Sequence, residues 1–428
     1  MTNKIQKVKG MIDVLPDDQD IWTRIYQLVF ELANFYGFSQ IITPVIEKEE
    51  LFLRSSGRGS DIVQKQMYSF TTKGGERVVL RPEFTPSLVR AYIESLQVKP
   101  KPVKLYTQGP LFRYENPQKG RYREFNQFDF EIFGDASPIA DALLIQLFSQ
   151  FLIDIKIKNF FIEINSIGCR SCREKYKTEL KKYYRYKIKS LCPSCQKRYK
   201  INILRILDCK EEKCQRIRQF SPQIIDFLCD SCKEHFQKLI DVLDEIEVSY
   251  VINPYLVRGL DYYSGPVFEF KLGDPGEKDK DDLTLIAGGR FDYLISELGG
   301  KDTPAVGGAG GIERIVEIIK NNNIKISPNS TNKFLSKPKA CLIPIGELAK
   351  IKVFKILKVF YNKNIRVYQN ISGSNLSAEL ARANKMKIKY ALIIGQKEAM
   401  DEKIILRDME KGTQKIINQK EILKEIKK

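Results

Sequence analysis

The sequence predicts an α+β protein: a large N-terminal domain built on an antiparallel sheet, a helical insertion within it, and a smaller C-terminal α/β domain. Three observations lead to this prediction. Residues 109–134 have the pattern of two strands joined by a basic loop, residues 169–245 combine paired cysteines with lysine-rich helical stretches, and residues 339–428 alternate short apolar strands with helices. The polar stretch 326–338 has the composition of a linker, so we expect the N-terminal domain to span 1–325.

The charge balance points to a polyanionic partner. The 428 residues include 71 lysines and arginines against 53 aspartates and glutamates, a formal charge of +18. Such a balance suggests nucleic acid first and an anionic membrane surface second, while the alternative is excess lysine that only keeps the surface soluble. No run of about 18 apolar residues occurs and the N-terminus has no apolar signal segment, so we expect no membrane span and a cytoplasmic location.

The N-terminal elements begin with an amphipathic helix. Residues 20–33 place apolar side chains at helical spacing, and residues 38–47 have the pattern of a strand that Pro44 breaks. A proline within an apolar strand indicates an edge or an interface position. Residues 78–95 then pair a strand with a helix. Binding residues commonly project from such a strand end. The polar residues there are Arg81, Glu83 and Thr85.

The predicted hairpin has two unlike faces. In its second strand Gln127, Asp129 and Glu131 alternate with apolar residues, so the polar side chains share one face and the apolar ones share the other. The apolar face suits a packed core. The polar face, together with Arg113 of the first strand, suits a pocket for a small zwitterion and an anion. The alternative is an antiparallel hairpin with one face in water.

Basic side chains beside glycines indicate further contacts with phosphate or with a flat ring. Glycine lets such a group approach the backbone, and arginine can pair with a phosphate or stack on a base. In the hairpin loop the basic residues are Lys119, Arg121 and Arg123. A turn that enters a strand at 258–263 gathers Arg258, Asp261, Tyr262 and Tyr263. A glycine-rich strand at 307–311 runs into a helix that bears Glu313 and Arg314.

The cysteines indicate metal rather than disulfide bonds. Eight of the nine fall in four close pairs, and such spacing in an intracellular protein favours metal binding. The pairs could supply two tetrahedral thiolate sites, for which zinc is the usual ion, and the alternative is cysteines without metal. The candidate ligands are Cys169, Cys172, Cys192, Cys195, Cys209, Cys214, Cys229 and Cys232. We expect the single histidine, His235, to be structural or solvated rather than a general base.

Taken together, these segments resemble the class II aminoacyl-tRNA synthetases, and most closely the histidyl-tRNA synthetase family. The TPVIE segment at 43–47 resembles motif 1 of the class, 112–134 resembles motif 2, and 307–315 resembles motif 3. Residues 256–270 (LVRGLDYYSGPVFEF) resemble the histidine-recognition signature of that family, and 287–300 resemble its second signature. The segments ALIIGQKEAM and IILRDMEKGTQ resemble the anticodon-binding domain of the histidyl, prolyl, threonyl and glycyl enzymes.

This resemblance implies a fold and an activity. The fold is an α+β catalytic domain of class II type on an antiparallel sheet, with a C-terminal α/β anticodon-binding domain. The activity is that of a ligase that uses ATP with Mg²⁺ to convert L-histidine to histidyl-adenylate and transfers histidine to the 3′ end of tRNA(His), as a homodimer. Two alternatives stay open. One is a catalytically silent paralogue, the regulatory subunit of ATP phosphoribosyltransferase, and the other is a tRNA-binding module.

The resemblance also implies roles for individual residues. Those that would bind histidine are Glu83, Thr85, Gln127, Glu131, Arg258, Tyr262 and Tyr263, and those that would bind ATP are Arg113, Arg121 and Arg314. Arg113 and Arg258 would act in catalysis by holding the α-phosphate. The sequence departs from the family at Asn116, where motif 2 usually has arginine, and at Asn126, where histidine is common.

Overall fold

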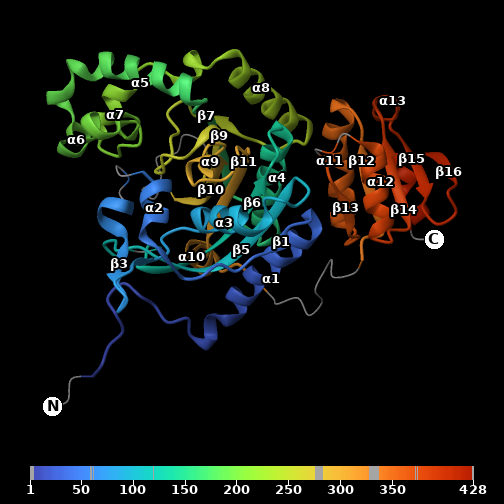
Figure 1. Ribbon diagram of the computed structural model, residues 1–428, viewed down its shortest axis with the longest axis horizontal. Coiled ribbons are helices and arrows are strands. Elements are labelled where there is room, and N and C mark those ends of the chain that lie inside the picture. The colour runs from blue at the N-terminus through green and yellow to red at the C-terminus, as the bar shows by residue number, and fades with distance from the viewer. Residues whose placement is uncertain are drawn as a thin grey trace.

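The computed structural model describes residues 4–57, 60, 62–118, 120–274, 283–326, 337–371, 373 and 375–426. Figure 1 shows a mixed α/β body, an all-helical part above it, and a C-terminal domain at its side. Almost all of the predicted linker at 326–338 lies outside the described residues.

An eight-stranded sheet forms the centre of the N-terminal domain, in the order β1-β5-β6-β11-β10-β9-β7-β8. The inner strands pair antiparallel, and only β1 and β8 at the two edges pair parallel with their neighbours, so the predicted antiparallel sheet is confirmed. The strands are β1 Ser39–Gln40, β5 Val103–Phe112, β6 Glu124–Phe133, β7 Phe160–Ser166, β8 Val251–Ile252, β9 Ser264–Leu272, β10 Thr284–Arg290 and β11 Ala305–Gly311.

Helices cover one face of this sheet. They are α1 Gln19–Tyr36, which follows the 3-10 turn η1 Pro16–Asp18, α4 Pro138–Asp154 and α10 Ile312–Asn321. On that face Phe128 and Phe130 of β6 are fully buried against Phe148 of α4. The alternation predicted for the hairpin is therefore confirmed, because its apolar side chains enter the core and its polar ones point to the opposite face.

A small antiparallel sheet, β2-β4-β3, adjoins the body. Its strands are β2 Ile46–Lys48, β3 Tyr68–Thr71 and β4 Arg77–Leu80, and the helical segments around it are α2 Glu49–Ser55, η2 Ile62–Gln66, α3 Thr85–Ala91, η3 Tyr92–Leu96 and α9 Leu294–Glu297. Arg81, at the end of β4, corrects one expectation. Its buried guanidinium donates to the carbonyls of Thr43 (2.7 Å) and Pro110 (3.1 Å), so it fastens two loops instead of projecting into a site.

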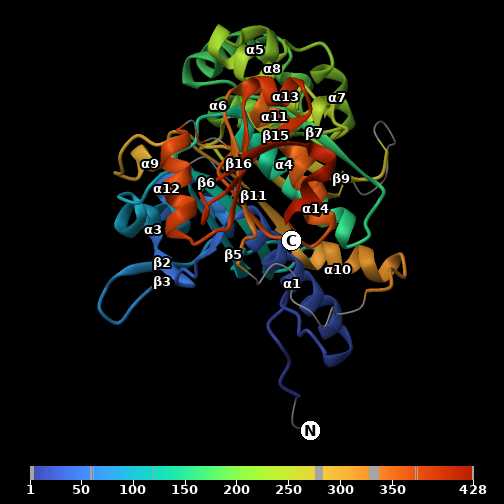
Figure 2. The same ribbon diagram turned by 90° about the vertical axis from the view of Figure 1, so that its right-hand side faces the viewer.

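The insertion is entirely helical in its described elements, and Figure 2 shows it at the end of the molecule away from the N-terminus. It comprises α5 Arg170–Arg185, η4 Ile188–Ser190, α6 Pro193–Ile201, η5 Ile203–Ile206, α7 Glu212–Arg218, η6 Ile224–Phe227 and α8 Asp230–Glu245. Tyr176, Leu180 and Tyr184 of α5 form a small core with Ile206 and Leu207. The helix α8 returns to the body, where Leu239 and Leu243 join the main core.

The C-terminal domain is a five-stranded sheet with helices, in the order β13-β12-β14-β15-β16. Its elements are β12 Ala340–Pro344, α11 Glu347–Asn362, β13 Val367–Gln369, α12 Leu376–Lys385, β14 Tyr390–Ile394, α13 Gln396–Met400, β15 Lys403–Asp408, β16 Gln414–Asn418, η7 Gln419–Glu421 and α14 Ile422–Ile426. The predicted α/β domain is confirmed. The pattern of short apolar strands does not indicate the last strand, β16, because most of its side chains are exposed.

Side-chain contacts join the two domains. Gln369 donates to the carbonyl of Tyr36 (2.9 Å), and the ring of Tyr361 packs edge-on against Phe35 at 4.8 Å between centroids. Glu245, at the end of α8, accepts from Lys352 of α11 at 2.8 Å. Among the described residues, no helix is both long and apolar enough to cross a membrane.

Candidate active site

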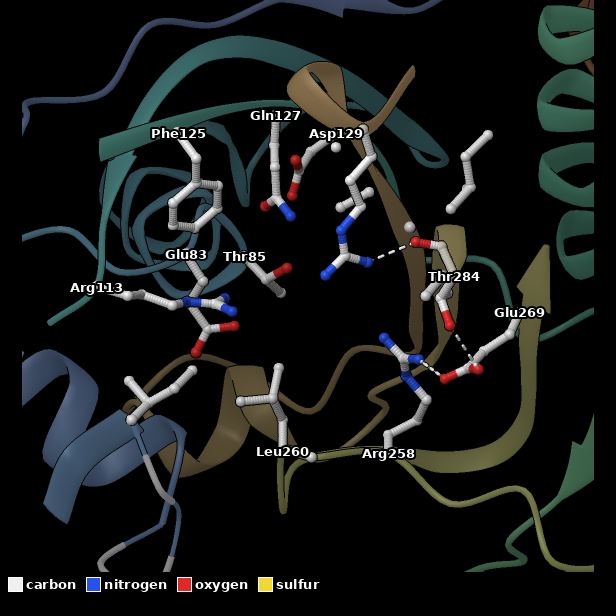
Figure 3. A pocket seen from close by; sticks show the side chains of 18 of the residues that line it. Glu83, Thr85, Arg113, Phe125, Gln127, Asp129, Arg258, Leu260, Glu269 and Thr284 are labelled. Carbon is white, nitrogen blue, oxygen red and sulfur yellow. Dashed lines mark hydrogen bonds and ion pairs between the residues drawn. The ribbon is translucent and has the colours of Figure 1, made fainter. Parts of the chain in front are cut away.

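A cavity of about 430 Å³ lies on the polar face of the central sheet (Figure 3). Its floor comes from β6, β10 and β11, and its walls come from the hairpin loop and from the turn at 258–263. The cavity brings together all but one of the residues proposed for histidine and ATP, namely Glu83, Thr85, Arg113, Arg121, Gln127, Arg258, Tyr262, Tyr263 and Arg314. The exception, Glu131, lies directly below and accepts a hydrogen bond from Thr85 (2.7 Å).

Three buried carboxylates lie at one end of the cavity: Glu83 and Asp129 line it, and Glu131 accepts a hydrogen bond from the lining residue Thr85. Glu83 accepts from Ser56 (2.6 Å) and from the hydroxyl of Tyr262 (2.8 Å). Asp129 and Glu131 neighbour it on β6, and each keeps one buried oxygen, Oδ1 and Oε2, without a hydrogen-bond partner. A buried acceptor without a partner is costly in a folded protein. These oxygens are therefore suited to a ligand that brings N–H donors.

Burial and mutual repulsion act on the carboxyl groups at this end. Burial and then the charge of Glu83 raise the pKa of Asp129 well above its usual range. Burial and then the charge of Asp129 raise the pKa of Glu131 in the same way. Burial also raises the pKa of Glu83, against its hydrogen bonds and the charge of Arg113. A positive ligand among these groups would relieve their repulsion and favour their charged forms.

A glycine makes room for the deepest carboxylate. Gly307 of β11 pairs with Glu131 of β6, and a Cβ placed on Gly307 would come within 1.4 Å of Glu131 Oε2. The Glu131 carboxylate thus occupies the space that a side chain at position 307 would fill. Gly308 and Gly310 have another role, since a Cβ there would strike Phe148 and Phe128. Part of the glycine-rich strand therefore serves aromatic packing rather than approach by a ligand.

Arg258 and Arg314 form the opposite end of the cavity, while Arg113 lies beside Glu83 (Figure 3). Arg113 donates to the carbonyl of Pro82 (2.9 Å) and lies over the ring of Phe125, 5.2 Å from its centroid. Arg314 donates to the carbonyl of Thr284, and burial together with Arg121 and Arg113 lowers its pKa to about 10, which leaves it charged at neutral pH. Cations this close to one another in a cavity favour a polyanion.

Arg258 lies across the cavity from Arg113 and on the same side as Arg314. It forms an ion pair with Glu269 of β9, and Thr284 donates to the other oxygen of that carboxylate at 3.1 Å (Figure 3). Its guanidinium carbon lies 5.6 Å from the centroid of the Tyr263 ring. Glu269 thus holds the guanidinium of Arg258 in the wall of the cavity.

The sequence reasoning did not assign several lining residues. Asp129 was placed on the polar face but was given no role, and alternation with the core residues Phe268 and Phe270 could have placed Glu269 on the same side. Arg205 also lines the cavity although it belongs to the insertion. No pattern within the insertion could have indicated that contact.

Residues 10–315 match the family model described as histidyl-tRNA synthetase, and residues 339–428 match the anticodon binding domain model. The chain belongs to the histidyl-tRNA synthetase family. A relative from Thermosipho melanesiensis, named histidine--tRNA ligase, is 40% identical over 410 residues, 96% of this chain and 95% of that protein. One of the same name from Natranaerobius thermophilus is 38% identical over 408 residues, 95% of this chain and 94% of that protein. The crystal structure of apo S. aureus histidyl-tRNA synthetase matches with a TM-score of 0.62 at 29% identity, over 99% of this chain and 100% of that one.

The two departures from the family's motif 2 occupy different positions. Asn126 donates to the carboxylate of Glu313 from its backbone nitrogen (2.8 Å) and from its side chain (3.0 Å), which ties the start of α10 to β6. Asn116 is exposed in the loop, and Lys119 lies outside the described residues. Where the family commonly has histidine, this chain thus has Asn126, whose side chain adds a second hydrogen bond to the Glu313 carboxylate of motif 3.

The insertion brings its cysteines together in two groups that the sequence could not pair. We call the group Cys169, Cys172, Cys229 and Cys232 the root cluster, and the group Cys192, Cys195, Cys209 and Cys214 the distal cluster. Within each group the sulfur atoms all lie within 4.8 Å of one another, and none is in a disulfide. Four thiols at this spacing fit a tetrahedral metal site. The root cluster joins the beginning of the insertion to its end.

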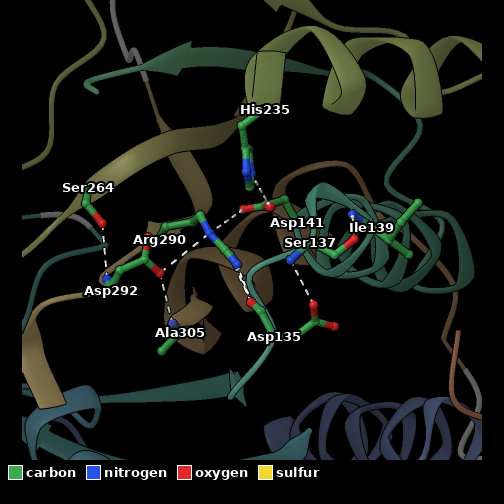
Figure 4. Close-up of polar contacts among 9 residues, drawn as sticks. All are labelled: Asp135, Ser137, Ile139, Asp141, His235, Ser264, Arg290, Asp292 and Ala305. Carbon is green, nitrogen blue, oxygen red and sulfur yellow. Dashed lines mark hydrogen bonds and ion pairs between the residues drawn. The ribbon is translucent and has the colours of Figure 1, made fainter. Parts of the chain in front are cut away.

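His235 lies outside the cavity. Its Nε2 is 2.9 Å from Asp141 of α4, and the buried Arg290 lies between Asp141 and Asp292 (Figure 4). Arg290 also donates to the carbonyl of Asp135. The network thus joins α8 and β10 to α4.

Proposed function

We propose that the protein is a histidine--tRNA ligase. It activates L-histidine with ATP to give histidyl-adenylate and pyrophosphate, and it transfers histidine to the terminal ribose of tRNA(His). The observation that carries this proposal is a single cavity with buried carboxylates at one end and arginines at the other, in a chain of this family. A small zwitterion with nitrogen donors and a nucleoside triphosphate match these two ends.

Histidine would bind at the carboxylate end. Its nitrogen donors, the ammonium and the imidazole, would meet the oxygens of Glu83, Asp129 and Glu131. The remaining proposed contacts are Thr85, Gln127, Tyr262 and Tyr263, with the two tyrosines against the imidazole. Burial and the charge of Glu83 raise the pKa of Tyr262 well above its usual range, so it stays a hydrogen-bond donor.

Adenylation would occur between the arginines. An oxygen of the histidine carboxylate forms a bond to the α-phosphorus while the bond to the bridging oxygen breaks and pyrophosphate leaves. Arg113 and Arg258 would stabilise the charge on the α-phosphate, and Arg121 and Arg314 would hold the leaving phosphates. Mg²⁺ enters with ATP as part of the substrate. In the second step a ribose hydroxyl displaces AMP, with an adenylate phosphate oxygen as base, so no protein histidine is required.

Histidine-dependent exchange of pyrophosphate into ATP tests this proposal. The purified protein is expected to catalyse exchange with histidine and not with the other amino acids, and to charge tRNA(His). The family model matched at 339–428 supports the charging step. Absence of exchange at saturating histidine and ATP would contradict a ligase. Retained tRNA binding would then indicate a binding module, and stimulation of an ATP phosphoribosyltransferase would indicate the regulatory paralogue.

A homodimer and a cytoplasmic location are part of the same proposal. Ile42 is 82% exposed, and Val45, Ile46 and Phe70 on or beside the small sheet are exposed as well. An apolar patch of this kind suits a protein interface, and it surrounds the motif 1 segment. Charged tRNA is used by cytoplasmic ribosomes. Light scattering is expected to show twice the mass of the 49.5 kDa chain.

We further propose that each cysteine cluster binds zinc. The sulfur geometry within both clusters supports it, since a small helical unit with a limited core gains stability from a metal cross-link. Elemental analysis of protein purified without added chelator is expected to give about two equivalents of zinc per chain. Less than about half an equivalent would contradict a structural role.

A further inference from the structure

The distal cluster encloses a segment that reaches the active site. Its cysteines flank residues 196–208, and within that segment η5 packs its buried Ile203 and Ile206 against the core of the insertion. The side chains of Asn202 and Arg205 leave this unit toward the catalytic domain. A metal at the distal cluster would therefore anchor both ends of the segment that carries them.

Both side chains contact the turn that carries the proposed substrate-binding residues. Arg205 Nη1 donates to the carbonyl of Gly259 (3.0 Å), and Asn202 Nδ2 donates to Asp261 Oδ1 (2.7 Å). Arg198 of α6 in turn donates to the carbonyl of Arg205 at 3.1 Å. We call the hydrogen bonds of Arg205 and Asn202 to the turn the distal grip. Gly259 directly follows Arg258, so the distal grip holds the backbone beside the arginine proposed for the α-phosphate.

A residue beside the root cluster holds the other end of the same turn. Arg173 of α5, next to Cys172, donates to the carbonyls of Tyr263 (2.8 Å) and Asp261 (3.3 Å). The two sets of contacts come from different helices and share Asp261, but only the distal one reaches Gly259 and only Arg173 reaches Tyr263. Losing the distal grip should therefore free Arg258 more than Tyr263.

We propose that metal binding at the distal cluster positions Arg258 for adenylation, through Arg205 and Asn202. Arg205 is a positioning residue in this scheme: it fixes the backbone that presents Arg258, while the reacting atoms remain those of histidine and ATP. The inference rests on the proposed ligase function for its kinetic readout. It makes the insertion a metal-dependent part of the active site.

Two variants test the proposal against a matched control. Arg205→Ala removes the grip and keeps every cysteine, whereas Cys209→Ser removes one ligand of the distal cluster. The control is Arg216→Ala, an exposed arginine of the same insertion that pairs with Glu212 of its own helix. Zinc content, exchange kinetics and hydrogen exchange of a peptide covering 256–264 are measured for all three.

Arg205→Ala is expected to keep the zinc content of the wild type and to lower kcat of pyrophosphate exchange about tenfold or more, because a small misplacement of a catalytic group is costly. The KM for histidine is expected to stay within about twofold, since the carboxylate end is untouched. Cys209→Ser is expected to lose the distal zinc equivalent and to show the same fall in kcat. In both variants the 256–264 peptide exchanges faster than in Arg216→Ala.

Several results would overturn the proposal. Equal kcat and equal hydrogen exchange in Arg205→Ala and Arg216→Ala would show that the grip does not position Arg258, and this comparison stands even if Cys209→Ser does not fold. If the wild-type protein has no metal at the distal cluster, metal does not position Arg258. The same conclusion follows if Cys209→Ser loses metal but hydrogen exchange at 256–264 is no faster. If the wild type lacks pyrophosphate exchange, the ligase proposal fails, and hydrogen exchange still decides the coupling.

Discussion

Replacing Arg258 by alanine is expected to lower kcat of histidine-dependent pyrophosphate exchange by about 100- to 1,000-fold. The guanidinium faces the cavity opposite Arg113, and it forms an ion pair with Glu269. In the transition state the α-phosphate carries more charge than in the ground state, so the loss falls mainly on kcat. Steady-state exchange at saturating histidine and ATP measures it.

The control for this variant is Arg77→Ala. Arg77 lies on the small sheet and pairs with Glu49 at 2.8 Å, and its side chain is largely exposed, so its loss should leave exchange near the wild-type rate. Circular dichroism and zinc content should match the wild type in both variants. Exchange by Arg258→Ala at more than about a third of the wild-type rate would show that another group stabilises the phosphate.

Glu131→Gln is expected to raise the KM for histidine by about 10- to 100-fold, since a hydrogen bond to a charged group contributes roughly 1.5–3 kcal/mol. The amide keeps the acceptor for Thr85 and the volume of the side chain but loses the charge proposed to pair with the ammonium of histidine. The KM for ATP should change little, because the arginine end is intact. Exchange kinetics with each substrate varied in turn gives both constants.

The same variant is expected to be more stable than the wild type without substrate. Burial and the charge of Asp129 raise the folded-state pKa of Glu131 well above its usual range. For a carboxyl group with a raised folded-state pKa, the unfolded state loses its proton first, so stability falls as pH rises above about 4.3, the ordinary value for glutamate. Glutamine lacks this penalty. Thermal unfolding should show an advantage for the variant at pH 7 that disappears near pH 4, and a wild type that is the more stable at pH 7 would contradict the assignment.

The local patterns predicted much of the fold because they depend on neighbours in the chain. Alternation in the second strand of the hairpin placed Gln127, Asp129 and Glu131 on one face, since successive side chains of a strand point to opposite sides. The strand missed at Gln414–Asn418 shows the limit of such patterns. It is an edge strand with mostly exposed side chains, so alternation left too weak a signal.

Motif resemblance brought together residues that local patterns could not. Glu83 and Tyr262 are far apart in the sequence, and their hydrogen bond at 2.8 Å exists only because β4 and the turn at 258–263 meet over the sheet. The pairing of the cysteines needed the fold as well. Eight thiols permit many groupings, and only the return of α8 to the root of the insertion joins the first pair to the last.

By itself the sequence determined the alternating faces, the cysteine pairs and the motifs that identify the family, because each of these is a property of residues close together in the chain. Only the tertiary structure decided that Glu131 lies under Gly307, that Arg81 fastens loops, and that Arg205 of the insertion reaches the turn beside Arg258. These contacts join segments distant in sequence, and such segments meet only when the sheet and the insertion pack together.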